Sequence, residues 1–553
     1  MHRIEGQNFI KDSQGRNIFT DGPPPTTLPA AFMNSVQEEI ATVIETAGLQ
    51  LATQATDNLK NQLYNAILSI SSGSVDNAVS SQAQLNDLIE RIGANQYQFK
   101  GTVRSIFLKR DPNGTGYLMS GTSSFLSGGD TWGELQTNNC GYIFCENDAF
   151  FNVGIERSYF KMNTDNAMYT GIRIVGDTAS SAAITYGFDV SGSNIAMYNC
   201  GVKLRNTTTG FSGFDGNNIK TNKYIGCHVT NIQGTNTVNG FHQCYNLDGC
   251  YLDTLSTANS ALNCIRSSVN VKNCVLLNMS ATGTGTVYGV YLCENINNCE
   301  LDNFDTVNGD CRGFYDSDNI SNCTLNIFDS TGTGNLHGFN TCNRVNNCQL
   351  TDFDTTGVNS QIRGFTVCDR VLNCDLSDFE TTHSGGAIYG FFSCENISNF
   401  TVDDLIGIGN IWGMTTCNNV NNGRITNIEV SSGVSNAQAY GNCDYITTCY
   451  CSTIDADSGN AYGFSSCKYI SSCYTNDIDA NSGDSYGFTN STYLTACYAN
   501  DIDSVSGNSY GFQNCQYGSS LNSSETTNPN CDYIDTDDAA ITNKYSCNRT
   551  MWT

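Results

Sequence analysis

The sequence predicts an all-β protein, a right-handed parallel β-helix (solenoid) of about 25 residues per coil, with a small α-helical region at its N-terminus. Three observations predict this fold. Two columns of cysteine recur at intervals of 23 to 27 residues, each repeat carries a glycine followed by a bulky apolar residue, and short apolar and polar stretches alternate without a helical period. The Leu-x-x-Leu-x-Leu pattern of leucine-rich repeats is missing. The right hand follows from the chirality of parallel crossovers.

The two cysteine columns define the register of the coils, because each recurs once per repeat. The first column contains Cys200, Cys227, Cys250, Cys274, Cys299, Cys323, Cys348, Cys374, Phe400, Gly423, Cys449, Cys473, Cys497 and Leu521. The second column lies six residues earlier and contains Cys244, Ser268, Cys293, Ser317, Cys342, Cys368, Cys394, Cys417, Cys443, Cys467, Ser491 and Cys515. Equivalent residues of successive coils should stack at the strand spacing of about 4.8 Å.

The spacing of the cysteines also predicts their role. The chain has 27 cysteines, an odd number, and its first residues lack the apolar core of a secretion signal, so a full disulfide framework is not expected. Cysteine in a column that Ser, Phe and Leu also fill is a small apolar side chain that faces the interior. Disulfides between neighbouring coils and metal binding are the alternatives, although no Cys-x2-Cys pair opens onto histidine ligands. We expect reduced, shielded thiols and neither metal nor cofactor.

Composition excludes several classes of partner. Charged residues make up 14% of the 553 residues, and the net charge is −27. A chain this acidic lacks the basic patches that nucleic acids and anionic membranes require. No apolar run approaches the length of about 20 residues that a membrane span needs.

The first hundred residues depart from the repeat. Apolar residues at helical spacing predict helices over residues 29–47, 57–68 and 82–92, separated by a Ser-rich linker. We therefore divide the chain into a helical attachment region (1–95), irregular first coils (96–180), the regular β-helix (181–521) and a C-terminal cap (522–553), which an open solenoid end needs.

This N-terminal segment carries a family resemblance. The stretches that carry it are NIFTDG (17–22), PAAFMNSVQEEI (29–40), VIETAG (43–48), and NQL (61–63) followed by AI (66–67). Together they resemble the N-terminal segment of tailed-bacteriophage tail fibre and tailspike proteins, although that segment commonly has Trp where Phe32 or Met33 stands. The resemblance covers about residues 15–68.

The resemblance implies that this end attaches to tail or baseplate proteins. The apolar residues that would make the attachment are Phe32, Val36, Ile40, Val43 and Ile44. It further implies a homotrimer whose distal part meets a host cell-surface glycan or receptor, made in the host cytoplasm and resident in the virion tail. Many such fibres and spikes have a β-helix body, which agrees with the repeats.

A column of acids raises the possibility of catalysis. In most coils an apolar residue and an acid come five and six residues after the first-column position. The acids are Asp305, Asp329, Asp354, Glu380, Glu429, Asp455, Asp479 and Asp503. A glycosidase needs two carboxyls about 5 to 9.5 Å apart, and the weak candidates are Asp477, Asp479, Asp501 and Asp503. Because these acids follow the repeat instead of breaking it, a solvated acidic stripe is the favoured interpretation, with cation-bridged carboxylates and catalysis as alternatives. No nucleophile–base pair emerges from the five scattered histidines.

Two tyrosine columns in the C-terminal coils are the binding candidates. One contains Tyr445, Tyr469, Tyr493 and Tyr517, and the other contains Tyr450, Tyr474 and Tyr498. Both positions should face outward, and aromatic rings beside hydrogen-bonding groups suit sugars. A subunit seam and simple stacking are the alternatives.

The sequence therefore favours a phage attachment protein, with a tailspike depolymerase of the same fold as the alternative. A secreted pectin-lyase-like enzyme or adhesin is disfavoured by the missing signal sequence.

Overall fold

The structure is a computed structural model, and four parts of the chain are described. These parts are residues 9–11, 17–19, 77–523 and 532–535. Within 77–523 the gaps are 94–95, 111–115, 119–133, 139, 147–148, 154–158, 177–184, 204–205, 208–209, 384 and 433–434. The helices predicted over 29–47 and 57–68, together with the attachment candidates Phe32, Val36, Ile40, Val43 and Ile44, lie outside the described residues.

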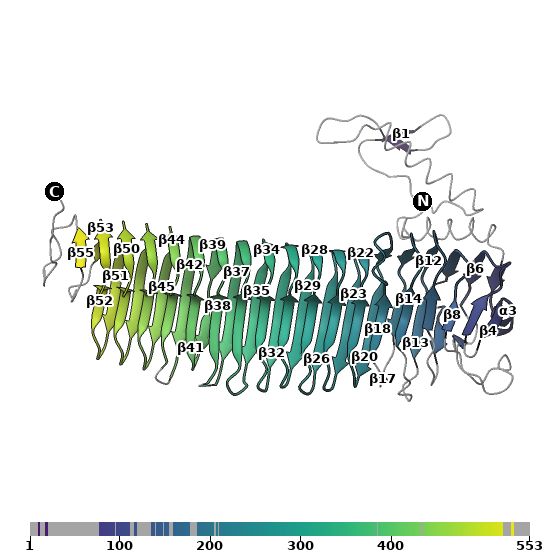
Figure 1. Ribbon diagram of the computed structural model, residues 1–553, viewed down its shortest axis with the longest axis horizontal. Coiled ribbons are helices and arrows are strands. Elements are labelled where there is room, and N and C mark those ends of the chain that lie inside the picture. Colours follow the sequence, from purple (N-terminus) through teal and green to yellow (C-terminus); the bar gives the residue numbers. More distant parts are fainter. Residues whose placement is uncertain are drawn as a thin grey trace.

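The described residues from 77 to 535 form a parallel β-helix of about 16 turns of about 25 residues, which confirms the predicted fold class (Figure 1). A regular coil has three strands, such as β46 (Ala461–Ser465), β47 (Lys468–Ser471) and β48 (Tyr474–Ala480). Each pairs in parallel with its equivalent in the next coil. At a strand spacing of about 4.8 Å, these turns make a rod of about 75 Å.

Three ladders run the length of the rod. The Gly-Phe ladder contains β18 (Phe211–Asp215), β21 (Val238–His242), β24 (Leu262–Arg266), β27 (Val287–Tyr291), β30 (Cys311–Tyr315), β33 (Leu336–Asn340), β36 (Gln361–Thr366), β38 (Ala387–Phe392), β41 (Asn410–Thr415), β43 (Ala437–Gly441), β46, β49 (Ser485–Thr489) and β52 (Ser509–Gln513). The short-strand ladder contains β19 (Lys223–Ile225), β22 (Tyr245–Asp248), β25 (Val269–Lys272), β28 (Glu294–Asn297), β31 (Asp318–Ser321), β34 (Asn343–Asn346), β44 (Asp444–Thr447), β47, β50 (Thr492–Thr495), β53 (Gln516–Ser519) and β55 (Asp532–Asp535).

The third ladder carries the acid column, and we call it the acid ladder. It contains β20 (His228–Gly234), β23 (Tyr251–Thr257), β26 (Val275–Ala281), β29 (Glu300–Thr306), β32 (Thr324–Ser330), β35 (Gln349–Thr355), β40 (Leu405–Gly407), β45 (Tyr450–Ala456), β48, β51 (Tyr498–Ser504) and β54 (Asn522–Ser523). Strands β37 (Asp369–Thr381), β39 (Glu395–Val402) and β42 (Asn418–Val430) span the corner between the short-strand and acid ladders.

The same three ladders extend through the first coils. Strands β8 (Glu134–Gln136), β11 (Tyr159–Met162) and β14 (Tyr186–Val190) lead into the Gly-Phe ladder. Strands β6 (Ser105–Leu108), β9 (Tyr142–Cys145), β12 (Met168–Thr170) and β15 (Ala196–Tyr198) lead into the short-strand ladder. Strands β7 (Tyr117–Leu118), β10 (Phe151–Val153), β13 (Arg173–Gly176), β16 (Gly201–Lys203) and β17 (Asn206–Thr207) lead into the acid ladder.

The rod begins before residue 96. Strand β3 (Asn77–Val79) pairs with β6, and helix α3 (Gln82–Asp87) buries Leu85 in the rod's core at one end (Figure 1). The helix predicted over 82–92 therefore ends at Asp87. The next residues form strand β4 (Ile89–Gly93), which pairs antiparallel with β5 (Gln96–Phe99), because pairing with the first coil overrides the local helical period. Apart from the rod, β1 (Phe9–Lys11) pairs antiparallel with β2 (Asn17–Phe19).

Both cysteine columns point into the core, and every residue of the columns with a side chain is at most 3% exposed. Aromatic residues stack beside them; the rings of Phe314, Phe339 and Phe365 lie 4.9 Å apart, centroid to centroid, at each step. Every described cysteine is a buried free thiol, and many thiols donate to backbone carbonyls, as Cys274 does to Lys272 at 3.2 Å. The columns thus act as packed apolar ladders, as their spacing predicted.

Each regular coil turns its corners through left-handed residues. Four positions per coil have φ near +55°, and asparagine is the residue that fills them most often. Asparagine tolerates this conformation because its short polar side chain bonds locally, whereas most other side chains pay a steric penalty. One of the four columns begins as asparagine and ends as tyrosine.

Candidate functional site

Tyr445, Tyr469, Tyr493 and Tyr517 lie on the short-strand ladder at the end of the rod opposite α3 (Figure 1). Their exposed fractions are 51, 44, 46 and 49%, so the predicted outward orientation holds. Their rings stack on one another at centroid distances of 4.7, 4.8 and 4.9 Å. The inner ring faces therefore contact neighbouring tyrosines, and the column presents ring edges and hydroxyls to solvent.

These four tyrosines occupy a left-handed column, with φ between 56° and 60°. Upstream coils have Asn295, Asn319, Arg344, Arg370, Asn396 and Asn419 at the equivalent position, so asparagine is the commonest residue there. The asparagines are linked by side-chain hydrogen bonds, such as that from Asn319 to Asn295 at 3.2 Å. A bulky residue in this conformation costs on the order of 1 kcal/mol or more, and such strain clusters at functional sites. The change from asparagine to tyrosine replaces a relaxed polar ladder with a strained, exposed aromatic one.

The second tyrosine column starts the acid-ladder strands β45, β48 and β51. Tyr450, Tyr474 and Tyr498 are half-buried and stack at 5.3 and 5.0 Å. The Tyr474 hydroxyl donates to Asn476, and Arg424 lies over the Tyr450 ring at 5.7 Å. Tyr469 and Tyr474 flank the same corner of one coil, so both tyrosine columns border one edge of the rod.

The acid column is in register from coil to coil along the acid ladder. Asp479 pairs with Asp455 and Asp503, while the intervening Ile478 is buried, so the acids project outward as predicted. Burial, and then the charges of Asp477, Asp503, Asp455 and Asp501, raise the pKa of Asp479 to about 6. The catalytic candidates Asp477, Asp479, Asp501 and Asp503 thus lie on two adjacent coils, but a hollow on this ladder lies elsewhere.

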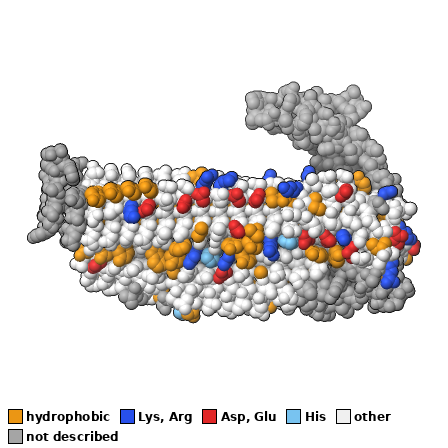
Figure 2. All heavy atoms as spheres, viewed as in Figure 1, with side chains coloured by type: hydrophobic (Ala, Val, Ile, Leu, Met, Phe, Trp, Pro, Cys, Tyr) orange, Lys and Arg blue, Asp and Glu red, His pale blue; other side chains and the backbone are white. Residues whose placement is uncertain are grey.

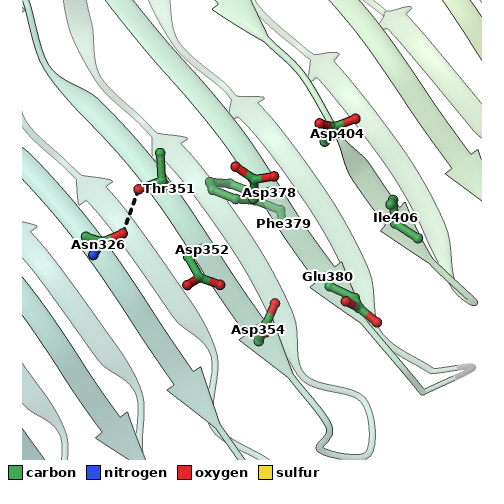
Figure 3. A pocket seen from close by; sticks show the side chains of 9 residues that line it. All are labelled: Asn326, Thr351, Asp352, Asp354, Asp378, Phe379, Glu380, Asp404 and Ile406. Atoms are coloured by element: carbon green, nitrogen blue, oxygen red, sulfur yellow. Dashed lines mark hydrogen bonds between the residues drawn. The ribbon is translucent and has the colours of Figure 1, made fainter.

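That hollow lies over strands β35, β37 and β40 and has a volume of about 720 Å³ (Figure 3). It is lined by Asn326, Thr351, Asp352, Asp354, Asp378, Phe379, Glu380, Asp404 and Ile406. Ile406 stands where the acid column should continue, between Glu380 and Glu429, and it is 38% exposed. The acid column is therefore interrupted at this hollow.

The electrostatics of the hollow centre on Asp354. Burial, and then the charges of Asp352, Glu380, Asp329 and Asp378, raise the pKa of Asp354 to about 6. A carboxyl that holds a proton near neutral pH beside other carboxylates can act as a general acid. No group of three or more His, Cys, Asp or Glu side chains arranged for a metal ion occurs among the described residues.

A second outward column, on the Gly-Phe ladder, was not predicted from the sequence. It consists of the residue before the small residue of each Gly-Phe pair, which is Ala439 in one coil and glycine in the others, and neighbouring side chains cover His337 and Tyr486. Its members are Tyr288, Arg312, His337, Arg363, Tyr389, Trp412, Gln438, Tyr462, Tyr486 and Tyr510. The recurring Tyr-Gly-Phe triplets of the last coils were the available signal. In the earlier coils the residue type at this position varies, so the column is recognised only from the register of the coils.

Comparison with protein-family models and with curated sequences gives no relative. No protein-family model matches the chain, and no curated protein sequence is significantly similar to it. No helix in the described residues has the length and apolarity to cross a membrane. Any function assigned to the chain therefore rests on its fold, its surface chemistry and the resemblance of its N-terminal segment.

Proposed function

We propose that this chain is a rod-shaped attachment protein of a phage-type tail, anchored through its N-terminal segment and contacting the host surface through the tyrosine columns at the opposite end. The single observation that carries the proposal is the column Tyr445, Tyr469, Tyr493 and Tyr517: four exposed aromatic residues in a strained conformation that asparagine fills upstream. Strain of this kind clusters at functional sites, and in this column it coincides with four exposed, stacked rings. Because residues 15–68 resemble tail attachment segments, the proposal places the N-terminal end of the rod at the particle and the tyrosine columns at the end that meets the host.

The ligand of the tyrosine columns in this proposal is a host cell-surface glycan or receptor. Exposed ring edges with hydroxyls offer apolar contact and hydrogen bonds together, which sugar surfaces require. The proposal includes a homotrimer, located in the tail of the particle. A mass measurement in solution tests the trimer directly.

The test replaces tyrosine by the residue that the column uses elsewhere. In the full-length Tyr469→Asn/Tyr493→Asn variant, two rings are lost while the left-handed backbone is relieved. We expect host-cell binding to weaken about tenfold or more, at about 1 kcal/mol per ring, with no loss of thermal stability. The matched control, Arg344→Asn/Arg370→Asn, changes the same column in earlier coils and should bind normally.

Two results would contradict this assignment. Unchanged adsorption of an intact oligomer would remove the tyrosines from the receptor site. Dissociation of the oligomer would instead place them at a subunit seam.

A second candidate function, hydrolysis of a surface polysaccharide, is favoured by one observation. Asp354, with its pKa raised to about 6, lies in a hollow that other carboxyls line, which is the residue chemistry of a two-carboxylate glycosidase. If the chain cleaves its receptor, host polysaccharide will release new reducing ends, and Asp354→Asn will abolish the release. If the chain only attaches, neither the original chain nor the Asp354→Asn variant will release reducing ends.

A further inference from the structure

A strip of aromatic and arginine side chains lies on the Gly-Phe ladder between β24 and β41. We call it the aromatic-arginine strip, and it comprises Arg266, Tyr288, Tyr291, Arg312, Tyr315, Arg363, Tyr389, Phe392 and Trp412. All nine side chains are half-buried. Hydrophobic and charged side chains gather in bands along the rod (Figure 2). Within the strip, Arg312 and Arg363 lie between Tyr288 on one side and Tyr389 and Trp412 on the other.

The strip is pre-organised by contacts among its own members. The Arg312 guanidinium lies over the rings of Tyr315 and Tyr288, at 4.6 and 5.6 Å from the centroids. Arg363 lies over Phe392 and Tyr389 in the same way, at 4.8 and 5.4 Å. A guanidinium held over a ring is already positioned, so little rotamer entropy remains to be lost on binding.

The strip has more positive charge than its own carboxylates neutralise. Arg312 is paired with Asp310 at 2.7 Å. Arg363 donates instead to the neutral Gln361, at 2.6 and 3.1 Å, and Arg266 lies over Tyr291 with its Nε buried without a hydrogen-bond partner. Among the residues that the structure describes, no carboxylate forms an ion pair with Arg266 or Arg363.

The buried histidine of this column carries no charge. His337 lies between Arg312 and Arg363 in the column. Burial, and then the charge of Arg312, lower the pKa of His337 to about 3, and Arg363 acts in the same direction against Asp310. His337 is therefore neutral at physiological pH, and two guanidinium groups without a carboxylate remain in a chain whose net charge is −27.

We propose that the aromatic-arginine strip is a second binding site, for a linear anionic glycan that lies along the rod. Arg266 would bind its carboxylate or phosphate groups through the Nη atoms, because its Nε is buried. Arg363 would bind them through the fork that donates to the neutral Gln361, because a charged acceptor forms the stronger hydrogen bond. The rings of Tyr291, Tyr389 and Trp412 would pack against the sugar units. A sugar unit in a linear chain advances by a length close to the coil spacing, so successive units meet successive coils.

Charge separates this ligand from the competing occupant, a second copy of the chain. Isologous self-association would bring each strip against itself and place arginines that lack carboxylates opposite one another. A trimer would instead bring the strip against a different face of the neighbouring copy, and the mass of the oligomer in the variant below tests that contact. An anionic glycan would neutralise the guanidinium groups of both Arg266 and Arg363. The site lies on a different ladder from Tyr445 and Tyr469, so the inference does not depend on the assignment of the receptor site.

Titration calorimetry of the full chain with three hexamers tests the inference. The probes are hexagalacturonate, a glycerol-phosphate hexamer and the neutral maltohexaose, and the first two distinguish carboxylate from phosphate. We expect at least one acidic hexamer to bind and maltohexaose not to bind. Arg266→Gln/Arg363→Gln should weaken that binding by about tenfold or more, because charged hydrogen bonds are lost. The matched control, Arg344→Gln/Arg370→Gln, removes the same charge from the short-strand side and should bind within about twofold of the original.

The remaining outcomes overturn the inference. Failure of both acidic hexamers to bind, equal binding of maltohexaose, or an equal loss in the control variant would each contradict a specific anionic site. A fall in the oligomer's mass in Arg266→Gln/Arg363→Gln would show that the strip joins two copies. If that variant does not fold, Arg363→Lys decides the question, because it keeps the charge and loses the fork; normal binding by Arg363→Lys would then reject the site.

Discussion

Phe400 and Gly423 fill consecutive positions of the first cysteine column and pair in register. A Cβ atom on Gly423 would lie 2.0 Å from the Phe400 ring, so the ring occupies the space of two ordinary column side chains. We expect Phe400→Cys to cost about 2–4 kcal/mol through a cavity and Gly423→Cys about 1–3 kcal/mol through overpacking. The double variant should cost less than either, because it restores the cysteine column. Denaturant unfolding measures all three, and additive losses would contradict the pairing.

The acid column should make stability depend on pH. Asp354 has a folded-state pKa of about 6, above its ordinary value of about 4, so between these values the folded chain holds a proton that the unfolded chain does not. Its contribution to stability is therefore complete below about pH 4 and is lost as the pH rises through about 6. We expect Asp354→Asn to raise the melting temperature at pH 7 by about 1–2 °C, a small effect because the group is partly solvated.

The same melting scans at about pH 4 provide the control. Both Asp354 and the substituted Asn are then neutral in the folded chain, and the difference in melting temperature should nearly vanish. A stabilisation that is equal at both pH values would show that the carboxyl's charge is not its cause.

Sequence periodicity predicted which way individual side chains face but not how they are held. The inward cysteines and the outward Tyr445 column follow from the repeat alone. The left-handed backbone of Tyr445 depends on how a coil turns its corner. The hollow at Ile406 depends on three coils lying side by side, where a single missing acid changes the surface. Neither the left-handed backbone of Tyr445 nor the hollow at Ile406 has a local sequence signal.

Among the single elements, helix α3 closes one end of the rod. Leu85 is fully buried against the first coils, whereas Ala83 on the same helix is exposed. We expect Leu85→Glu to lower stability by several kcal/mol, because it buries an unpaired charge, and to promote end-to-end association through the uncovered strand edges. Melting curves and light scattering measure both effects. Ala83→Glu is the matched control, and an equal effect in the control would contradict the capping role.

The helix predicted over 82–92 shows where element prediction fails. Leu85 and Ile89 are four residues apart, a spacing that satisfies a helix, and both are buried. Ile89 nevertheless pairs with Phe99 across an antiparallel turn. Pairing with residues ten positions away decides the element, and such pairing cannot be read from a local window.

The rod as a unit should fold without the segment that precedes it. Solenoid coils contact only their neighbours, and β3 at Asn77 is the first strand of the rod. Deletion of residues 1–75 should therefore leave the melting temperature unchanged but abolish incorporation into tail particles. A deletion of residues 1–95 would also remove Leu85 and Ile89 from the core. A loss of incorporation could then result either from a less stable rod or from the missing attachment segment. A truncated chain that still assembles would contradict the attachment role.

The proposed function requires a polarity along the rod: the N-terminal segment at the particle, and Tyr445 to Tyr517 at the far end. Electron microscopy of particles that carry the chain, with a gold label fused after Thr553, locates the far end. We predict that the label marks the tips of rods that project from the tail, and that its distance from the tail is unchanged in the Tyr469→Asn/Tyr493→Asn variant, which weakens host binding. Labels against the tail body, or particles without the chain, would contradict this polarity.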